Sequence, residues 1–260
     1  MPTDPLDLPA YLRRLGWQGE APPTLATLEA LHLQHLAAIP FENLDVLLGR
    51  PIRLDLAGLQ AKLVRAGRGG YCFEHNTLFA AVLRALGFQV SQLEARVRRG
   101  AETVLGRTHG VLRVDLGGAG WLVDVGFGGD GLLVPAALDG TELIRFGERH
   151  RVLPEGRLRV LQTWAEGAWR DQYAFALDPV EPIDWVVANH YTATHPDSRF
   201  TRVLTAQMPQ PGLRRVLRDR TYTETRDGVT TVRELAAPEV AALLREGFGL
   251  DLPELVSLLN

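Results

Sequence analysis

The sequence predicts an α+β fold built from three consecutive units. Apolar residues at helical spacings fill residues 1–90, which indicates a helical unit. Short β-type runs separated by glycine fill residues 91–188, and several such strands with tight turns favour a small antiparallel barrel or sandwich. Residues 189–260 mix short strands with a final amphipathic helix. We expect this third unit to pack as a lid over the other two.

The composition is ordinary for a globular protein. The 260 residues are 46% hydrophobic and 23% charged, with a formal net charge of -3, so neither a nucleic-acid partner nor a basic membrane-binding face is expected. The single cysteine excludes an intramolecular disulfide and a Cys-rich zinc site. The N-terminus lacks a basic segment followed by an apolar one, and no apolar run reaches membrane-spanning length. We therefore expect a cytoplasmic protein.

Four helices are predicted in the first ninety residues, and the first three begin at a side chain that can cap them. They run from Asp7 to about Gly16, from Thr24 to just before Ile39-Pro40, from Asp55 through Val64, and from Cys72 to Gly87. Residues 40–44 interrupt this pattern and are predicted to form a turn with an exposed aromatic residue, Phe41.

The remaining elements are predicted from β-type runs and turn residues. Strands are expected at 90–97, 110–116, 121–125, 158–164 and 169–176. A loop-rich section at 179–196 precedes further short strands at 201–207, 220–225 and 230–232. Asp227-Gly228 signals a hairpin turn, and the last helix is expected to begin near Pro238.

Cys72 is the first candidate for chemistry, because it lies between a glycine pair and an apolar helical run. The unpaired N–H groups and the dipole of a helix N-terminus favour the thiolate form of a cysteine placed there. Gly69 and Gly70 would allow positive φ angles and leave room for a substrate. Arg68 could add positive charge near the sulfur or hold a carboxylate. A lone cysteine is more often a small buried hydrophobe, so a base and a carboxylate are also needed.

A predicted hairpin supplies both the base and the carboxylate. If Gly117-Gly118 forms a two-residue turn, Val111 faces Asp124 and His109 faces Gly126. His109 and Asp124 are then diagonal neighbours on one face, with Cβ atoms roughly 7–8 Å apart. Aspartate is disfavoured inside strands, so Asp124 should have a specific partner. An ion pair with Arg113 and the orientation of His109 are about equally supported by the pattern alone.

Three other patterns are weaker. His32 and His35 have a metal-compatible spacing, but no third ligand follows, so solvated or hydrogen-bonded histidines are favoured. His75 points away from Cys72 on a helix and is a poor base for it. The glycine-rich segment 126–131 lacks the ending of a P-loop, but its position after Asp124 would let it hold the diphosphate of an acyl carrier such as coenzyme A.

These residues together resemble those of the arylamine N-acetyltransferase family. The matches occur in order, cover most of the chain and are highly specific in combination. They are Tyr11–Gly16, Leu31–His35, Ile39–Leu44, Arg68–Glu74, Thr108-His109, Asp124–Gly128 and Asn189–Phe200. The sequence departs from the family pattern at His75, where Leu or Gln is more usual.

The resemblance implies a cysteine-protease-like core with a helical bundle at 1–90, a β-barrel at 91–188 and an α/β lid at 189–260. It implies transfer of an acetyl group from acetyl-CoA to an arylamine or arylhydrazine nitrogen, through an acetyl-cysteine intermediate, in ping-pong fashion and without a metal. This chemistry belongs to xenobiotic metabolism. Because the chain ends soon after its last predicted helix, a tail contact to coenzyme A is expected to be missing.

The resemblance also implies the role of each site residue. Cys72 would be the nucleophile, His109 the base and then the acid, and Asp124 the group that orients the histidine. The residues implied in substrate binding are Phe41 and Phe127 for the acceptor, and Gly106, Thr108 and Gly128 for coenzyme A.

Two alternatives remain open at this stage. A papain-like or transglutaminase-like hydrolase uses the same triad with water or lysine as acceptor. A small-molecule binding module with an inert cysteine would use no triad at all.

Overall fold

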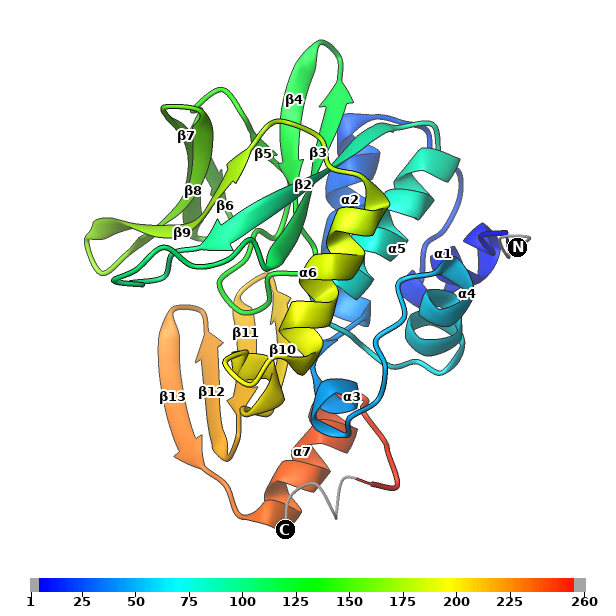
Figure 1. Cartoon of the computed structure of the whole chain (residues 1–260), viewed down its shortest axis with the longest axis vertical. Coiled ribbons are helices and arrows are strands. Elements are labelled where there is room, and N and C mark those ends of the chain that lie inside the picture. The colour runs from blue at the N-terminus through cyan, green and yellow to red at the C-terminus, as the bar shows by residue number, and fades with distance from the viewer. Residues whose placement is uncertain (1–4, 255–260) are drawn as a thin grey trace.

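Helices and two antiparallel sheets make up the α+β fold of the computed structural model, which describes residues 5–254 (Figure 1). The helices are α1 Leu8–Leu15, α2 Leu25–Ala38, α3 Leu44–Leu47, α4 Leu56–Leu59, α5 Cys72–Ala85, α6 Pro182–Thr194 and α7 Ala237–Phe248. A π-helical turn, Gln60–Arg65, continues α4, and a 3-10 turn spans Arg199–Thr201. None of the helices in residues 5–254 combines the length and apolar character needed to cross a bilayer.

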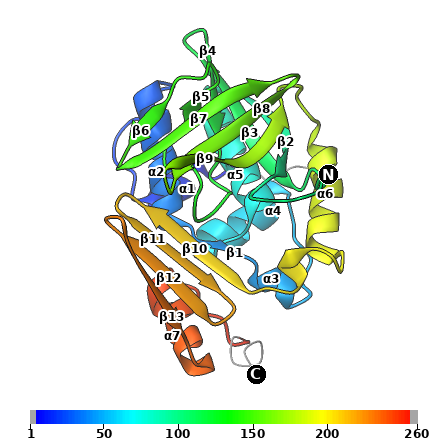
Figure 2. The same ribbon diagram turned by 90° about the vertical axis from the view of Figure 1, so that its left-hand side faces the viewer.

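The larger sheet has eight strands in the order β5-β4-β3-β2-β9-β8-β7-β6 and curls into a nearly closed barrel (Figure 2). Its strands are β2 Gln89–Val97, β3 His109–Leu116, β4 Ala119–Val123, β5 Ala136–Ala137, β6 Leu143–Arg145, β7 Glu148–Glu155, β8 Leu158–Ala165 and β9 Ala168–Ala176. All neighbouring strands are antiparallel, and β5 also packs near β7. Of the two architectures that the sequence allowed, the structure therefore has the barrel.

The smaller sheet joins distant parts of the chain in the order β1-β10-β11-β12-β13. Its strands are β1 Phe41–Glu42, β10 Thr205–Gln210, β11 Leu213–Arg218, β12 Thr221–Arg226 and β13 Val229–Glu234. Helix α7 packs on this sheet through Val240, Leu244 and Phe248. The boundary at 188 falls within α6, and β1 comes from the first ninety residues, so the division at 90 and 188 stays a prediction.

The capped helix starts are confirmed. The side chains of Asp7, Thr24 and Asp55 accept hydrogen bonds from backbone N–H groups three residues later, as N-cap residues do. Cys72 is confirmed as the first residue of α5. The hairpin at Asp227-Gly228 is also confirmed, with φ angles of 48° and 82° that suit a type I′ turn.

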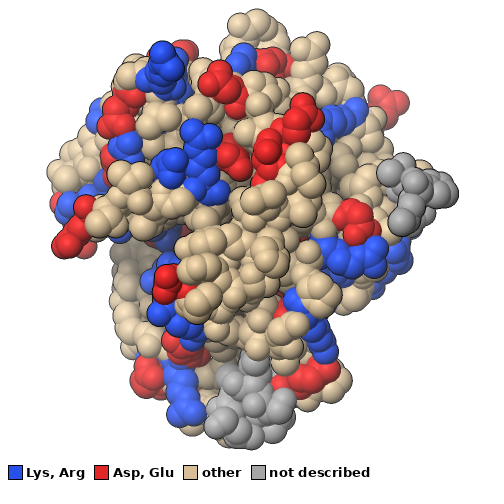
Figure 3. All heavy atoms as spheres, in the orientation of Figure 1, with Lys and Arg blue, Asp and Glu red and all other residues tan. Residues whose placement is uncertain are grey.

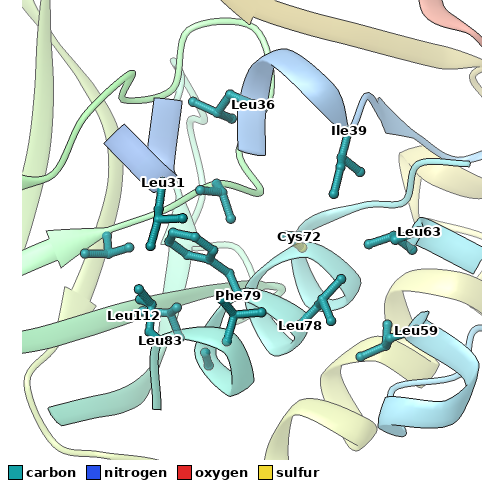
Figure 4. Packing of buried hydrophobic residues seen from close by; sticks show 14 of the residues in the cluster. Leu31, Leu36, Ile39, Leu59, Leu63, Cys72, Leu78, Phe79, Leu83 and Leu112 are labelled. Carbon is teal, nitrogen blue, oxygen red and sulfur yellow. The ribbon is translucent and has the colours of Figure 1, made fainter. Parts of the chain in front are cut away.

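Helix α5 lies at the centre of the main hydrophobic core. Figure 4 shows its Phe79 beside Leu31 of α2 and Leu112 of β3, and all three side chains are fully buried. Burial of a side chain of this size contributes about 1.5–3 kcal/mol to stability. The same helix carries Cys72 at its N-terminus, so the core that holds α5 also fixes the position of the thiol.

Several sequence predictions were wrong. Phe41 is 6% exposed, because its segment pairs with β10 instead of forming an open turn. The section at 179–196 contains α6, whose first turn holds Pro182, a residue that fits a helix start as well as a loop. Besides β1, four strands were missed: β5 and β6 are very short, and β7 and β11 are rich in charged residues.

Residues 1–4 and 255–260 lie outside the described part of the chain. The predictions about the N-terminal sequence and about the missing tail contact therefore stay predictions, as does the cytoplasmic location.

Candidate active site

A pocket of about 430 Å³ lies where the helices, the barrel and the smaller sheet meet. Cys72 of α5 and His109 of β3 line it together with three phenylalanines, Phe41, Phe127 and Phe200. Phe41 and Phe127 were predicted pocket residues, whereas Phe200 was noted only as part of a matching stretch. Its ring centroid is 6.1 Å from that of Phe41, so aromatic faces from β1 and from the 3-10 turn meet in this pocket.

Local sequence explains why Cys72 begins α5. Tyr71 has extended backbone angles, with φ -118° and ψ -170°, and so marks the residue before the helix. Its N–H donates a 3.1 Å hydrogen bond to Oε2 of Glu74, which is one half of a capping box. Cys72 is 3% exposed, and its Sγ lies 3.8 Å from the carbonyl oxygen of Thr108. The thiol thus faces the start of β3 from the positive end of a helix dipole.

Glycines let three backbone segments approach closely around the thiol. A Cβ at Gly69 would lie 2.0 Å from the Pro40 oxygen, and one at Gly126 would lie 2.6 Å from Cα of Cys72. Positive φ angles occur at neither Gly69 nor Gly70, so that part of the prediction was wrong. The two glycines make room for protein atoms, because β1 and the side chain of Glu74 pack directly against them.

The predicted hairpin brings His109 and Asp124 together. Gly117 and Gly118 form its two-residue turn with φ angles of 61° and 80°. The two strands pair in the predicted register, from Leu116 opposite Ala119 to Leu112 opposite Val123. Nε2 of His109 lies 2.7 Å from Oδ2 of Asp124. The predicted pairings of Val111 with Asp124 and of His109 with Gly126 were wrong, because the ladder stops at Leu112 and Val123, where the chain turns toward α2 and α5.

Asp124 is held by more partners than the sequence suggested. Its Oδ1 accepts hydrogen bonds from Nδ2 of Asn76 and from the N–H of Gly126, both at 2.9 Å. Its own N–H donates to Nε2 of His32 at 3.3 Å. Arg113 pairs with Asp115 instead, so the ion-pair alternative for Asp124 is excluded.

Asn76 is the main site residue that sequence reasoning missed. Its amide also donates to the Gly110 carbonyl at 2.7 Å and accepts from the Val125 N–H at 3.1 Å, so it joins α5 to both strands of the hairpin. The available signal was its spacing, because a residue four positions after Cys72 lies on the same face of the helix.

Electrostatics separate His109 from an ordinary buried histidine. Burial alone would lower its pKa, but the charge and hydrogen bond of Asp124, followed by the contact with Cys72, raise the pKa of His109 to about 10. Burial acts to raise the pKa of Asp124, yet His109, Asn76 and the Gly126 N–H lower it overall. The two opposite shifts favour an imidazolium beside a carboxylate, and the contact with Asp124 uses Nε2 of His109 and not Nδ1.

The His109 ring is also fixed by packing. The centroids of Phe127 and Tyr173 each lie 5.0 Å from it. Because these rings restrict its rotation, the imidazole is held between the thiol and the carboxylate.

A buried ionic cluster supports the loop before Cys72. Arg68 donates to Oε1 of Glu42 at 2.7 Å and to Oδ1 of Asp45 at 3.3 Å. Lys62 lies 2.8 Å from both Asp45 and Glu74, and their negative charges raise its pKa despite burial. Arg68 thus has the second of its two predicted roles, since it holds carboxylates.

Three further histidines are buried and hydrogen-bonded. Tyr11 contacts Nδ1 of His35 at 2.6 Å, and Nε2 of His35 contacts Nδ1 of His75 at 2.8 Å. His32 bonds the Leu133 carbonyl at 3.0 Å. The prediction of hydrogen-bonded histidines is confirmed and that of solvated ones is wrong. Among residues 5–254, no three or more His, Cys, Asp or Glu side chains gather as a metal site would require.

The residues predicted to contact coenzyme A are separated in the structure. Gly106 and Thr108 line the pocket, whereas Gly128 packs against Gln207, whose Oε1 would lie 2.5 Å from a Cβ at that position. In the segment 126–131, the N–H groups of Gly126, Gly129 and Gly131 already donate to protein oxygens. Contacts from all three predicted residues to coenzyme A stay predictions.

Comparisons with known proteins agree with this geometry. Residues 24–256 match the family model described as N-acetyltransferase. The arylamine N-acetyltransferase of Mycolicibacterium smegmatis is 40% identical over 258 residues, which covers 96% of this chain and 94% of that protein.

Solved structures are similar over nearly the whole length. The arylamine N-acetyltransferase of M. tuberculosis has a TM-score of 0.93 at 37% identity, covering 97% of this chain and 99% of that chain. The Mycobacterium marinum arylamine N-acetyltransferase in complex with CoA has a TM-score of 0.91 at 36% identity, covering 97% of each chain. The chain therefore belongs to the arylamine N-acetyltransferase family, and it is an acetyltransferase.

Proposed function

We propose that the protein transfers an acetyl group from acetyl-CoA to the nitrogen of an arylamine or arylhydrazine through an acetyl-Cys72 intermediate. The observation that carries this proposal is the linked set of Cys72 and His109 in the wall of the pocket and Asp124 directly behind His109. The 2.7 Å contact to Asp124 raises the pKa of His109 to about 10, which favours an imidazolium beside the sulfur. An imidazolium stabilises a thiolate, which is the nucleophilic form of cysteine.

The proposed reaction has two half-reactions. The Cys72 thiolate attacks the thioester carbonyl carbon, the carbon–sulfur bond to coenzyme A breaks, and His109 gives its proton to the departing sulfur. The amine nitrogen then attacks acetyl-Cys72, His109 takes the proton from that nitrogen, and the Cys72 thiolate leaves. Each cycle thus returns the thiolate–imidazolium pair, and no proton is gained or lost by the enzyme.

The pocket supports an aromatic acceptor. Phe41, Phe127 and Phe200 line it with apolar rings, against which an arylamine ring would pack. These rings also restrict water near the sulfur, which protects the acetyl group from hydrolysis. A weakly basic aromatic amine is unprotonated at neutral pH, so its nitrogen is free to attack.

Positive charge around the pocket supports a phosphate-bearing donor. Arg99 and Arg199 line the pocket. Asp130 pairs with Arg99, but burial still lowers the pKa of Arg99. The positive charges of Arg218, Arg199 and Arg214 lower this pKa further. Several guanidinium groups are therefore close enough to repel one another. A coenzyme A molecule, with its diphosphate and 3′-phosphate, would relieve this repulsion.

The experiment is a pre-steady-state measurement of coenzyme A release. Acetyl-CoA is mixed with the enzyme without an acceptor, and both free coenzyme A and the intact protein mass are followed. We expect a burst of one coenzyme A per enzyme and one acetyl group on Cys72, then little further release. Addition of 4-aminobenzoate or phenylhydrazine should restart turnover, with parallel double-reciprocal plots.

Two variants complete the design. Cys72→Ala should show neither the burst nor the acetyl group, and Cys72→Ser should be strongly impaired. Acetylation that persists in Cys72→Ala would overturn the intermediate. Continuous coenzyme A release without an acceptor would instead indicate a hydrolase.

A further inference from the structure

A second cavity, of about 530 Å³, lies between α5, α6, β2 and the segment that leads into α4. Of the described residues that line it, none also lines the catalytic pocket. We refer to this cavity as the α5–α6 groove. Nothing in the proposed reaction uses it.

Polar groups without partners point to a ligand in this groove. Trp185 is 1% exposed, and its indole N–H has no hydrogen-bond acceptor within residues 5–254. The hydroxyl of Thr77 is likewise buried and unpartnered. Gln92 is 6% exposed, and its side-chain amide has no partner in the described structure either. The indole N–H and the hydroxyl lie behind the wall of the groove, whereas Gln92 lines it. A buried polar group left unpaired costs about 1–3 kcal/mol, so a molecule that pairs with the Gln92 amide would bind favourably.

The charges of the groove favour an anion. Within the described part of the chain, Arg84 bonds only a carbonyl oxygen, that of Val90, and no carboxylate there neutralises its guanidinium. Among residues 5–254, the one acid on the lining is Asp55, which is already engaged by Arg53 at 2.7 Å and by the N–H of Gly58 at 2.9 Å. The amide of Gln92 and the guanidinium of Arg84 can both donate hydrogen bonds to an anion. A carboxylate is the acceptor that suits such a set of donors.

The remaining lining is apolar. Leu54, Leu56, Ala81 and Val186 contribute aliphatic surface, and Trp185 adds an aromatic ring. Figure 3 shows that the surface over the middle of α6 carries neither acidic nor basic side chains. We propose that the α5–α6 groove binds a small apolar carboxylate, with its charged end toward Arg84 and Gln92 and its apolar body against Val186 and the other aliphatic side chains of the lining.

A ligand in this groove would lie near the backbone that carries the proposed nucleophile and base. The ring of Trp185 lies 5.8 Å from that of Phe73, the residue after Cys72. It also lies against Gly110, the residue after His109, where a Cβ would come within 2.8 Å of the indole. Trp185 therefore contacts both the groove and the backbone that carries the nucleophile and the base.

The test uses phenylacetate, which has no amino group and so cannot accept an acetyl group. Cys72 is first alkylated with iodoacetamide to obstruct the catalytic pocket, so that the outcome does not depend on the proposed reaction. The protein has five tryptophans, and Trp185→Phe assigns the indole N–H resonance of Trp185 in a ¹H–¹⁵N spectrum. We expect phenylacetate to shift this resonance saturably, and neutral phenylacetamide to bind about tenfold more weakly, since one charge-assisted hydrogen bond is lost.

Matched variants locate the site. Val186→Phe narrows the groove, whereas Val187→Phe changes a neighbouring residue that is 68% exposed and does not line it. We expect about tenfold weaker binding in Val186→Phe and in Arg84→Gln, and unchanged affinity in Val187→Phe. All three positions are on the surface, so these variants should fold. Absence of saturable binding, or equal affinity in all variants, would overturn the site. Equal affinity for phenylacetamide would overturn the carboxylate assignment.

Discussion

His109, His35 and His75 are all buried beside or within α5, but the pKa of His109 shifts in the opposite direction from those of the other two. His109 is 3% exposed, His35 is fully buried and His75 is 1% exposed, so the loss of water is nearly the same for all three. The pKa of His109 is nevertheless raised to about 10, whereas burial lowers the pKa of His75 to about 4. Only His109 has a buried carboxylate as a hydrogen-bond partner. The comparison shows that the partner, and not the depth of burial, decides whether a histidine is charged here.

The uncharged histidines form a chain whose proton positions are fixed. Nε2 of His75 lies 3.2 Å from the Pro40 oxygen and 3.1 Å from the Gly70 oxygen, and carbonyls can only accept, so this nitrogen carries the proton. Nδ1 of the neutral His75 ring must then accept from His35, and Nδ1 of His35 must accept from the Tyr11 hydroxyl. The chain ends on the carbonyls that flank β1 and the nucleophile loop. It therefore supports the site without carrying charge.

The largest expected effect comes from making His109 resemble His75. Asp124→Asn removes the carboxylate but keeps the shape, so the pKa of His109 should fall and the imidazolium should be lost. By analogy with other triads we expect kcat/KM for acetyl transfer to drop about 10⁴-fold. The measurement is the rate of the coenzyme A burst, together with alkylation of Cys72 between pH 5 and 9.

Asp115→Asn is the matched control, because Asp115 lies on the same hairpin and pairs with Arg113. It should retain near-normal activity. Comparable rates in wild type and Asp124→Asn would mean that the carboxylate does not control the charge of His109.

An effect of intermediate size is expected in the pH dependence of the free energy of unfolding. The pKa of His109 in the folded protein is above its unfolded value of about 6.5. Its contribution to the free energy of unfolding is therefore fully present below about pH 6.5 and is lost as the pH rises toward about 10. For His75 the folded pKa is lower, so its contribution is complete above pH 6.5 and is lost as the pH falls toward about 4. The shift corresponds to a change on the order of 5 kcal/mol for His109 and on the order of 3 kcal/mol for His75.

Urea unfolding of wild type, His109→Gln and His75→Gln from pH 4 to 10 measures these windows. The alkaline loss of stability should become shallower only in His109→Gln, and the acid loss should become shallower only in His75→Gln. The same slopes in both variants would show that the two histidines do not differ as the structure implies.

The contrast also explains what the sequence could predict. The residues of the proposed triad and the hairpin register were predicted from local signals: the glycine pair before Cys72, the turn at Gly117-Gly118 and an aspartate in a predicted strand. Capped helices were predictable for the same reason, because a cap is defined within four residues. Each of these signals depends on near neighbours in the chain.

What the sequence could not predict depends on contacts between distant segments. Asn76 pairs with residues 34 to 49 positions away, and Phe41 is buried by a strand near residue 207. The histidine chain requires α1, α2 and α5 to be placed first, so the spacing of His32 and His35 alone could not separate hydrogen bonding from solvation. Short or charged strands such as β6 and β11 form because neighbouring strands pair with them, which overrides their weak local preference.

The smallest expected effect tests the far end of the neutral chain. Tyr11→Phe removes the hydroxyl that donates to His35 and leaves Nδ1 of that ring buried without a partner. The chain cannot reverse its protons, because His75 must still donate to the carbonyls of Pro40 and Gly70. Stability should therefore fall by about 1–3 kcal/mol, seen as a lower urea midpoint with an unchanged m-value, while kcat stays as in wild type. Tyr222→Phe is the matched control, since its hydroxyl bonds the side chain of Glu224, which is 25% exposed and can turn to water, so the removal should cost less. If instead Tyr11→Phe lowered kcat and left stability intact, the chain would be part of the reaction, and the division between charged and neutral histidines would fail.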